Sequence, residues 1–514
     1  MRSTDKTAAH RQRRETAVTK TETKPRERKT DASPSLFQRT RRLRLLIAVL
    51  SAAIGAALFS VFVFLPSVKY ASAKKLLAAD EPDKAMSELG QIYNFRDSAA
   101  LYGKAATAIG DAFLDIGYDI NAAVWFTWAG RSIEAEQIFD FHSVVSGSSY
   151  VTAAIAQNGK TYYLSNRDGD DKHAGAVTVS SFSAFLPHAP GVNGFDKFGF
   201  VKLHALGQYG VDLPSEQRET LCTTAGIKDM ISIPKSDDSP GYTVLLYQDG
   251  TIGILSEAKY PLSNTYSWKN IVSIKEGYRK IFGIDRAGRL HIAYESGYPD
   301  ELRYDISDWD GVQKVVETGK AIVGLTREGS ITVAYAGTEA RYRNSLTYQQ
   351  QITDIATNSN LLLLLRANGS VNAIRVPNWA ADGDSGADKY LDRAAAAVRG
   401  WRGVTRIRFA SKGLYGIRFD GTALYVSCDV SYNSEKRRYE YNTHPDFAAA
   451  VRRWTDTVDV INCGTHAVGV FADGTLEAIG DGTYLEARPN ASGATDYLRK
   501  PNGEYMNVND WKLW

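Results

Sequence analysis

Apolar and polar positions in the C-terminal two-thirds of the chain follow a pattern that returns unit after unit. In residues 268–293 an aromatic residue, Trp268, precedes an apolar run, a second apolar run leads to a turn ending at Gly288, and an alternating run follows. A polar–glycine turn between apolar runs is typical of β-hairpins, because glycine adopts the positive φ angles that such turns require. Each unit therefore predicts three short antiparallel strands.

The turn glycine sets the period of the repeat. The same turn ends at Gly159, Gly250, Gly288, Gly329, Gly369, Gly421 and Gly474. From Gly250 onward the steps are 38, 41, 40, 52 and 53 residues. Four tryptophans stand 20 residues before a turn glycine, and we interpret them as packing residues: Trp268, Trp309, Trp401 and Trp454. A repeat of this length with one hairpin per unit is typical of β-propeller blades, which stack into a ring.

One copy of the unit resembles a known repeat. Residues 461–476, INCGTHAVGVFADGTL, contain a small residue, a glycine and His466 before the turn, and they are similar to the regulator of chromosome condensation repeat. The resemblance covers roughly residues 140–514 and implies a degenerate, bacterial version with about seven blades. A worn turn within 200–210 would make eight. The resemblance does not imply nucleotide exchange or chromatin binding.

The N-terminal region separates a charged tail from an apolar segment. Residues 1–44 hold 14 Lys or Arg and 5 Asp or Glu, a composition typical of disorder. Residues 45–65 carry no charge, and 21 residues are enough to cross a bilayer core of about 30 Å as a helix. The positive-inside rule then places the tail in the cytoplasm and the rest of the chain outside. We expect a single-pass cell-membrane protein, with a signal peptide cleaved after 71–73 as the alternative.

Residues 67–140 predict a short helical segment. They are rich in alanine with helical periodicity, Pro82 is placed to start a second helix, and the segment resembles tetratricopeptide-type hairpins. It could be a stalk that holds the propeller off the membrane or a peptide-binding module. Trp125 and Trp128 fit packing against a neighbour better than a binding groove. The fold class is thus mainly β: tail 1–44, transmembrane helix 45–65, helical stalk 67–140 and propeller 141–514.

No constellation of residues predicts catalysis. The three cysteines, Cys222, Cys428 and Cys463, form no CxxC motif, so buried free thiols are favoured over a Cys428–Cys463 bridge. The eight histidines show no ligand spacing, and no phosphate-binding loop or dinucleotide fingerprint occurs. We expect no catalytic residues, no metal and no cofactor. The basic tail is interpreted as a topology signal, so no nucleic acid is expected as a partner.

Two insertions are the candidate contact loops, because inserted loops on one rim of a propeller are where partners usually dock. The first spans about 375–400 and the second surrounds 432–441; both could also be ordinary surface loops. The candidate contact residues are Trp379, Asp382, Asp384, Lys436, Arg437 and Arg438.

Binding is the function that the sequence favours. We expect a membrane-anchored scaffold at the cell surface that recognises a protein or a cell-wall glycan, with its oligomeric state left open. The alternatives are an extracellular enzyme acting on glycan or peptide through paired carboxylates, an inhibitor of a cell-wall enzyme by analogy with propeller-type β-lactamase inhibitory proteins, and a regulator that signals through the tail. Trp511 matches the opening aromatic of a unit, so the C-terminal end is expected to close the ring.

Overall fold

The computed structural model describes residues 36–148, 151–158, 161–165, 184–185, 193–195, 201–203, 215–233, 239, 241–258, 261–319, 321–335, 349–358, 361–375, 388–480, 487–489, 495–497 and 508–514. The chain divides into two compact units, Met1–Leu65 and Pro66–Trp514.

The described part of the first unit is helical. It consists of α1 (Leu36–Phe59) and a π-helical turn, η1 (Ser60–Phe64). In this turn the Leu65 N–H donates to the Ser60 carbonyl, five residues back instead of four. Pro66 follows directly and has no N–H, which explains why the regular ladder breaks here. Among the described residues, one helix, Ile47–Ala78, is long and apolar enough to span a membrane.

The second unit begins with five helices. They are α2 (Leu65–Ala78), α3 (Pro82–Gln91), α4 (Ser98–Asp115), α5 (Asp119–Trp128) and α6 (Ser132–Ile138). Pro82 occupies the first turn of α3, where a missing N–H costs nothing. Ala85, Ala105 and Ala106 are fully buried, and these small side chains allow neighbouring helices to approach closely.

Small antiparallel sheets make up most of the remaining structure. The clearest five are β10–β12 (Ile271–Gly277, Lys280–Asp285, Leu290–Tyr294), β13–β15 (Val312–Thr318, Ala321–Thr326, Ile331–Tyr335), β16–β18 (Ile352–Thr357, Leu361–Arg366, Val371–Arg375), β19–β21 (Val404–Ala410, Gly413–Arg418, Ala423–Ser427) and β24–β26 (Thr457–Asn462, His466–Phe471, Leu476–Gly480).

Three further three-stranded sheets and two ribbons precede, interrupt or follow these. The sheets are β1–β3 (Val145–Ser148, Val151–Ile155, Thr161–Ser165), β4–β6 (Ala184–Phe185, Asn193–Phe195, Val201–Leu203) and β7–β9 (Ile227–Ile233, Tyr242–Tyr247, Ile252–Leu255). The ribbons are β22–β23 (Asp429–Asn433, Arg438–Asn442) and β27–β28 (Ala487–Pro489, Thr495–Tyr497). Helices α7 (Ser215–Thr223), α9 (Asp388–Val398) and α10 (Pro445–Val451) lie between them in sequence, and short 3-10 turns include η2 (Phe141–Ser143) and η8 (Val508–Asp510).

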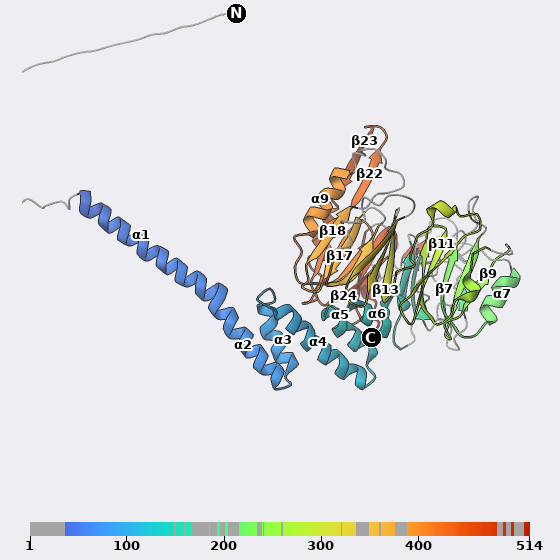
Figure 1. Ribbon diagram of the computed structural model, residues 1–514, viewed down its shortest axis with the longest axis horizontal. Coiled ribbons are helices and arrows are strands. Elements are labelled where there is room, and N and C mark those ends of the chain that lie inside the picture. The colour runs from blue at the N-terminus through green and yellow to red at the C-terminus, as the bar shows by residue number, and fades with distance from the viewer. Residues whose placement is uncertain are drawn as a thin grey trace, which may run out of the picture. The chain divides into compact units, whose positions relative to one another are not determined.

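Successive sheets pack through their first strands, which places these strands around a common axis. β10 lies beside β7, β16 beside β13 and β19, and β24 beside β19 and β1. Figure 1 shows these strands gathered in the propeller region, with β7 and β11 near one another and β17 and β18 near one another. In each three-stranded sheet the strands lie side by side in the order in which they occur in the sequence, as the repeat predicts.

The turn glycines that the structure describes, from Gly250 onward, are required by the contact between neighbouring sheets as well as by their own φ angles. The Gly421 carbonyl accepts a hydrogen bond from the Thr457 N–H at 2.8 Å. In the same way the Gly288 carbonyl accepts one from the Val312 N–H at 2.7 Å. Gly421 has a φ of 74°, and a Cβ there would lie 2.6 Å from the Asp456 Cα. Only glycine therefore fits both the turn and the approach of the next sheet.

The phased tryptophans pack on a second series of glycines, in the middle strands. A Cβ on Gly283 would lie 2.6 Å from the Trp268 ring, and one on Gly324 would lie 2.8 Å from the Trp309 ring. Trp268 is 5% exposed and Trp309 8% exposed. This contact explains why a glycine stands five residues before the turn glycine, and it supports the prediction that these tryptophans are packing residues.

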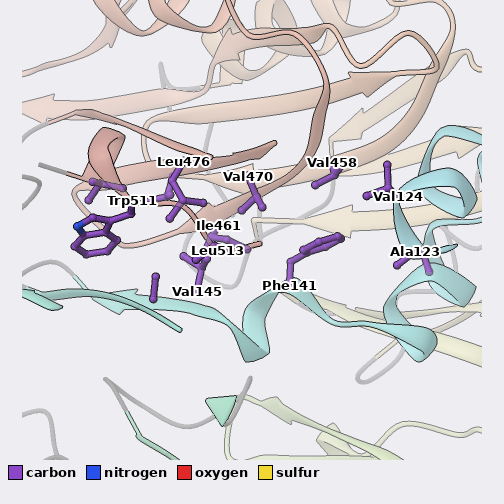
Figure 2. Packing of buried hydrophobic residues seen from close by; sticks show 14 of the residues in the cluster. Ala123, Val124, Phe141, Val145, Val458, Ile461, Val470, Leu476, Trp511 and Leu513 are labelled. Atoms are coloured by element: carbon purple, nitrogen blue, oxygen red, sulfur yellow. The ribbon is translucent and has the colours of Figure 1, made fainter. Parts of the chain in front are cut away.

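The C-terminal residues pack between the last and the first sheet. The Leu513 N–H donates to the Gly474 carbonyl at 2.8 Å, and the Gln157 N–H donates to the Leu513 carbonyl at 2.6 Å. Trp511 is 1% exposed and stacks on Tyr162 of β3. Figure 2 shows Trp511 and Leu513 in one apolar cluster with side chains from both ends of the propeller region. The two ends of the ring are thus joined through this segment.

Candidate partner-contact site

Polar side chains occupy the same place in five first strands of the propeller region, and the series they form is called the axial series. Each of these residues stands 15 positions before a turn glycine: they are Ser273, Lys314, Asp354, Arg406 and Asp459. Each also follows the point where the pairing of its strand with the middle strand shifts register. A β-bulge re-aims the following side chain, which accounts for polar groups inside an otherwise apolar strand.

Neighbouring members of this axial series form ion pairs. The Lys314 ammonium lies 2.5 Å from the Asp354 carboxylate, and the Arg406 guanidinium lies 2.7 Å from the Asp459 carboxylate. The side chains of Arg406 and Asp459 are both fully buried. Arg408, two residues further along β19, donates to Asp459 at 2.8 Å. Buried charges need partners of this kind, so the pairs lock adjacent sheets together.

Helix α6 adds a carboxylate to the same network. Glu136 contacts Arg408 closely and lies 3.4 Å from Arg406, which also donates to the Ser132 carbonyl at 3.0 Å. Burial opposes ionisation of Glu136, but the positive charges of Arg408, Lys314 and Arg406 outweigh it and hold the pKa well below its usual range. Glu136 therefore stays ionised at neutral pH and fixes α6 at one end of the axis.

Aromatic residues of the helices also contact the propeller region. They lie on the face that carries the turns between the middle and last strands. The Tyr93 ring stacks on Phe419 with a centroid distance of 3.9 Å, and the Tyr102 hydroxyl donates to the Phe419 carbonyl at 3.1 Å. The Trp128 indole N–H donates to the Thr457 carbonyl at 3.1 Å. The helices α3–α6 therefore cover the turn face of the propeller region, packed against it by burial and hydrogen bonds.

The opposite face carries a projection built from α9 and the ribbon β22–β23. The last strand β21 runs away from the helix-covered turn at Gly421, and β22 continues it beyond the sheet. The Tyr390 ring of α9 stacks on the Tyr441 ring of β23, with centroids 5.7 Å apart and planes 8° apart. The Arg393 guanidinium lies 5.5 Å from the Tyr441 ring. Figure 1 shows α9, β22 and β23 together, away from α3–α5.

Charged side chains crowd the tip of the ribbon. Glu440 accepts hydrogen bonds from Lys436 at 3.0 Å and Arg438 at 3.3 Å, and the bond from Lys436 contributes most to lowering the pKa of Glu440. The Asn433 side chain accepts the Lys436 N–H at 3.0 Å and closes the loop. The side chains of Lys436 and Arg438 are 54% and 66% exposed. The tip thus presents positive charge in a fixed loop.

The base of the projection holds a polar pocket of about 290 Å³. Asp429 lines it and accepts a hydrogen bond from the His444 Nε2–H at 2.7 Å, with the Lys412 ammonium 3.9 Å away. The Cys428 thiol also lines it, and burial raises its pKa to about 12. Such a thiol is a poor nucleophile at neutral pH. In the part of the chain that the structure describes, no cluster of His, Cys, Asp and Glu could hold a metal ion.

The predicted contact residues fall into two groups. Lys436, Arg437 and Arg438 lie at the exposed ribbon tip. Trp379, Asp382 and Asp384 lie outside the described residues. The three cysteines are free thiols, as predicted; Cys463 is buried, whereas Cys222 and Cys428 are only partly buried.

Sequence reasoning missed the axial ion pairs and α9. The axial series had a signal, because a polar residue stands 15 residues before the turn glycine in five of the repeat units. Helix α9 also had one, since Leu391, Ala394, Ala395 and Val398 are spaced as on one helix face and are all buried.

Comparison with known proteins assigns no family to the chain. No family model matches the chain. No curated protein matches it either. Among solved structures, the computationally designed Ika8 protein is 13% identical with a TM-score of 0.31, covering 63% of this chain and 92% of that one.

Two natural proteins show similar values. Prp20p from Saccharomyces cerevisiae is 14% identical with a TM-score of 0.27, covering 47% of this chain and 66% of that one. The CRINKLY WD40 ectodomain of the Arabidopsis thaliana receptor kinase ACR4 is 11% identical with a TM-score of 0.30, covering 66% and 96%. The propeller-like arrangement of the present chain rests on its own strand pairing.

Proposed function

We propose that this chain is a membrane-anchored scaffold whose propeller recognises a partner protein through the projection of α9 and β22–β23. The observation that carries the proposal is the stacking of Tyr390 on Tyr441. It joins two insertions from neighbouring repeat units into one surface, on the face that the helices leave free.

The chemistry of the projection suits a protein partner. Tyrosine and arginine are enriched where proteins meet, because they combine apolar area with directed hydrogen bonds. The projection offers Tyr390 and Tyr441 with Arg393 beside them, and Arg437 and Arg438 at the tip. Stacking holds Tyr390 and Tyr441 in place before binding, and hydrogen bonds to Glu440 hold Arg438, which lowers the ordering cost of association.

The proposed membrane topology follows from the charge around the apolar helix. Four arginines, at positions 39, 41, 42 and 44, precede it in sequence. This asymmetry supports a cytoplasmic N-terminus with the second unit outside the membrane. We interpret the molecule as a membrane-anchored bacterial relative of the condensation-regulator repeats. Sheet β4–β6 decides the number of blades: eight if it belongs to the ring, seven if it is an insertion.

Catalysis at the axis is the less supported alternative. A glycosidase pair needs one carboxyl group that stays protonated near neutral pH. Burial opposes the ionisation of Asp459, but Arg406 and Arg408 lower its pKa, and Glu136 behaves in the same way. Both are therefore ionised and paired with arginine, which favours structural locking over acid–base work.

Affinity capture from intact cells tests the proposal. The tagged chain is crosslinked and purified beside a variant with Arg437→Glu and Arg438→Glu. Arg453→Glu is the matched control, since Arg453 is 68% exposed and lies outside the projection. We expect one recurrent extracytoplasmic protein with the native chain and the control, and its loss with the double variant. Retention on isolated cell wall without a protein partner would overturn the proposal in favour of glycan binding.

A further inference from the structure

An apolar groove lies between α3, α4 and α5, on the helical segment and apart from the projection. It has a volume of about 610 Å³. Its lining comes mainly from α4 and its C-cap residue, with Ile109, Phe113 and Ile116, and α5 contributes Trp125. The lining runs along α4 from residue 108 to the C-cap at 116, a length of about 12 Å, enough for two turns of a bound helix.

Large apolar side chains remain exposed at one end of this groove. Ile116 is 64% exposed, Tyr118 58% and Leu114 40%. Most large apolar side chains of the neighbouring helices are buried or half-buried. A contiguous exposed apolar set beside a groove marks an interaction site more often than a chance surface.

The rim of the groove is acidic. Asp80 and Asp83 line it at the turn between α2 and α3, and the lining contains no lysine or arginine. By helical spacing on α4, Asp115 adjoins Ala112 at one end of the groove and Lys104 adjoins Ala108 at the other, so the acidic rim is the one formed by Asp80 and Asp83. The nearby Lys84 is paired with Glu81 at 3.0 Å. An anionic membrane surface is repelled by such a rim, whereas a cationic segment is attracted.

We propose that this groove binds an amphipathic helix of a partner protein, with an apolar face toward Phe113, Ile116 and Trp125 and with lysine or arginine toward Asp80 and Asp83. The site is separate from the projection on the free face. The chain thus offers two surfaces, one aromatic and cationic and one apolar and acidic, to partners of different chemistry.

A peptide titration on the full chain in zwitterionic lipid nanodiscs tests this proposal. The probe is a helical peptide of leucine and lysine at amphipathic spacing, and its matched counterpart has glutamate in place of lysine. A fluorophore on the peptide reports binding through its anisotropy, and empty nanodiscs correct for lipid binding. We expect the lysine peptide to bind at least tenfold more tightly than the glutamate peptide, with affinity falling as salt rises.

Variants separate the groove from the rest of the surface. Ile116→Glu is expected to weaken binding at least tenfold, and Asp80→Asn with Asp83→Asn severalfold. Tyr278→Glu, at a residue 66% exposed on the propeller region, should leave it unchanged. Circular dichroism and thermal unfolding establish that each variant folds. Equal binding of both peptides, or no loss in Ile116→Glu, would overturn the proposal. Loss of a dimer in Ile116→Glu, by native mass spectrometry, would instead assign the groove to a second copy of this chain.

Discussion

His466 provides a pH-dependent test of how the ring closes. It lies on β25 of the last sheet, is fully buried, and its Nε2 lies 2.6 Å from the Thr152 hydroxyl on β2 of the first sheet. Burial lowers its pKa from 6.5 to about 4. The folded state therefore disfavours the protonated ring, whereas the unfolded chain accepts a proton near pH 6.5.

The linkage between protonation and folding gives the size of the effect. Because the folded-state pKa is the lower one, the contribution of His466 to stability is complete above about pH 6.5 and declines as pH falls toward about 4. With these two values, the free energy of unfolding falls by about 2 kcal/mol between about pH 7.5 and about pH 5.

The assay compares denaturant unfolding of the full chain and of His466→Gln at both pH values. Glutamine keeps a hydrogen-bonding side chain near Thr152 and does not titrate, so the variant should lose about 2 kcal/mol less stability than the native chain on acidification. Taking the difference between the two proteins removes the contribution of other titrating groups. Equal losses in the two proteins would refute a buried neutral histidine at the junction.

Three further substitutions test other parts of the fold by thermal or denaturant unfolding. Arg406→Met leaves Asp459 buried with less positive charge and should cost about 3 kcal/mol, whereas Arg406→Lys should cost less; equal costs would argue against the ion pair. Gly283→Ala places a Cβ against Trp268 and should cost about 1–3 kcal/mol, with part of the loss recovered when Trp268 is shortened to Leu. Trp511→Ala removes a fully buried indole from the junction between the last and the first sheet and should cost about 3–5 kcal/mol of unfolding free energy. An unchanged unfolding midpoint would show that the C-terminal residues do not join the two sheets.

The repeat could be predicted from the sequence because each of its recurring residues is required for one physical reason. Turn glycines such as Gly421 are required because the turn has a positive φ and because the backbone of the next sheet leaves no room for a Cβ. Trp268 is required because its ring fills the space above Gly283. Requirements of this kind leave the same residue at the same phase. The apolar helix was equally legible, since its length and lack of charge depend on composition alone.

The projection of α9 and β22–β23 was harder to predict from the sequence because it depends on packing between neighbouring repeat units. Lys436 to Arg438 could be singled out as an exposed cationic loop, but nothing local indicates that Tyr390 would meet Tyr441. Likewise the axial charges are separated by about 40 to 50 residues, and only closure of the ring makes Arg406 and Asp459 neighbours. Pairings over such distances follow from the fold and not from the local pattern.

Site-specific photocrosslinking on intact cells tests the docking role of the projection most directly. A photoreactive amino acid is placed at position 437, at the ribbon tip, and in a parallel strain at position 453, outside the projection. The account predicts a single recurrent protein adduct at 437 that disappears when Tyr441 is changed to Ala, and no such adduct at 453. The absence of any protein adduct at 437, or the same adducts at both positions, would contradict it.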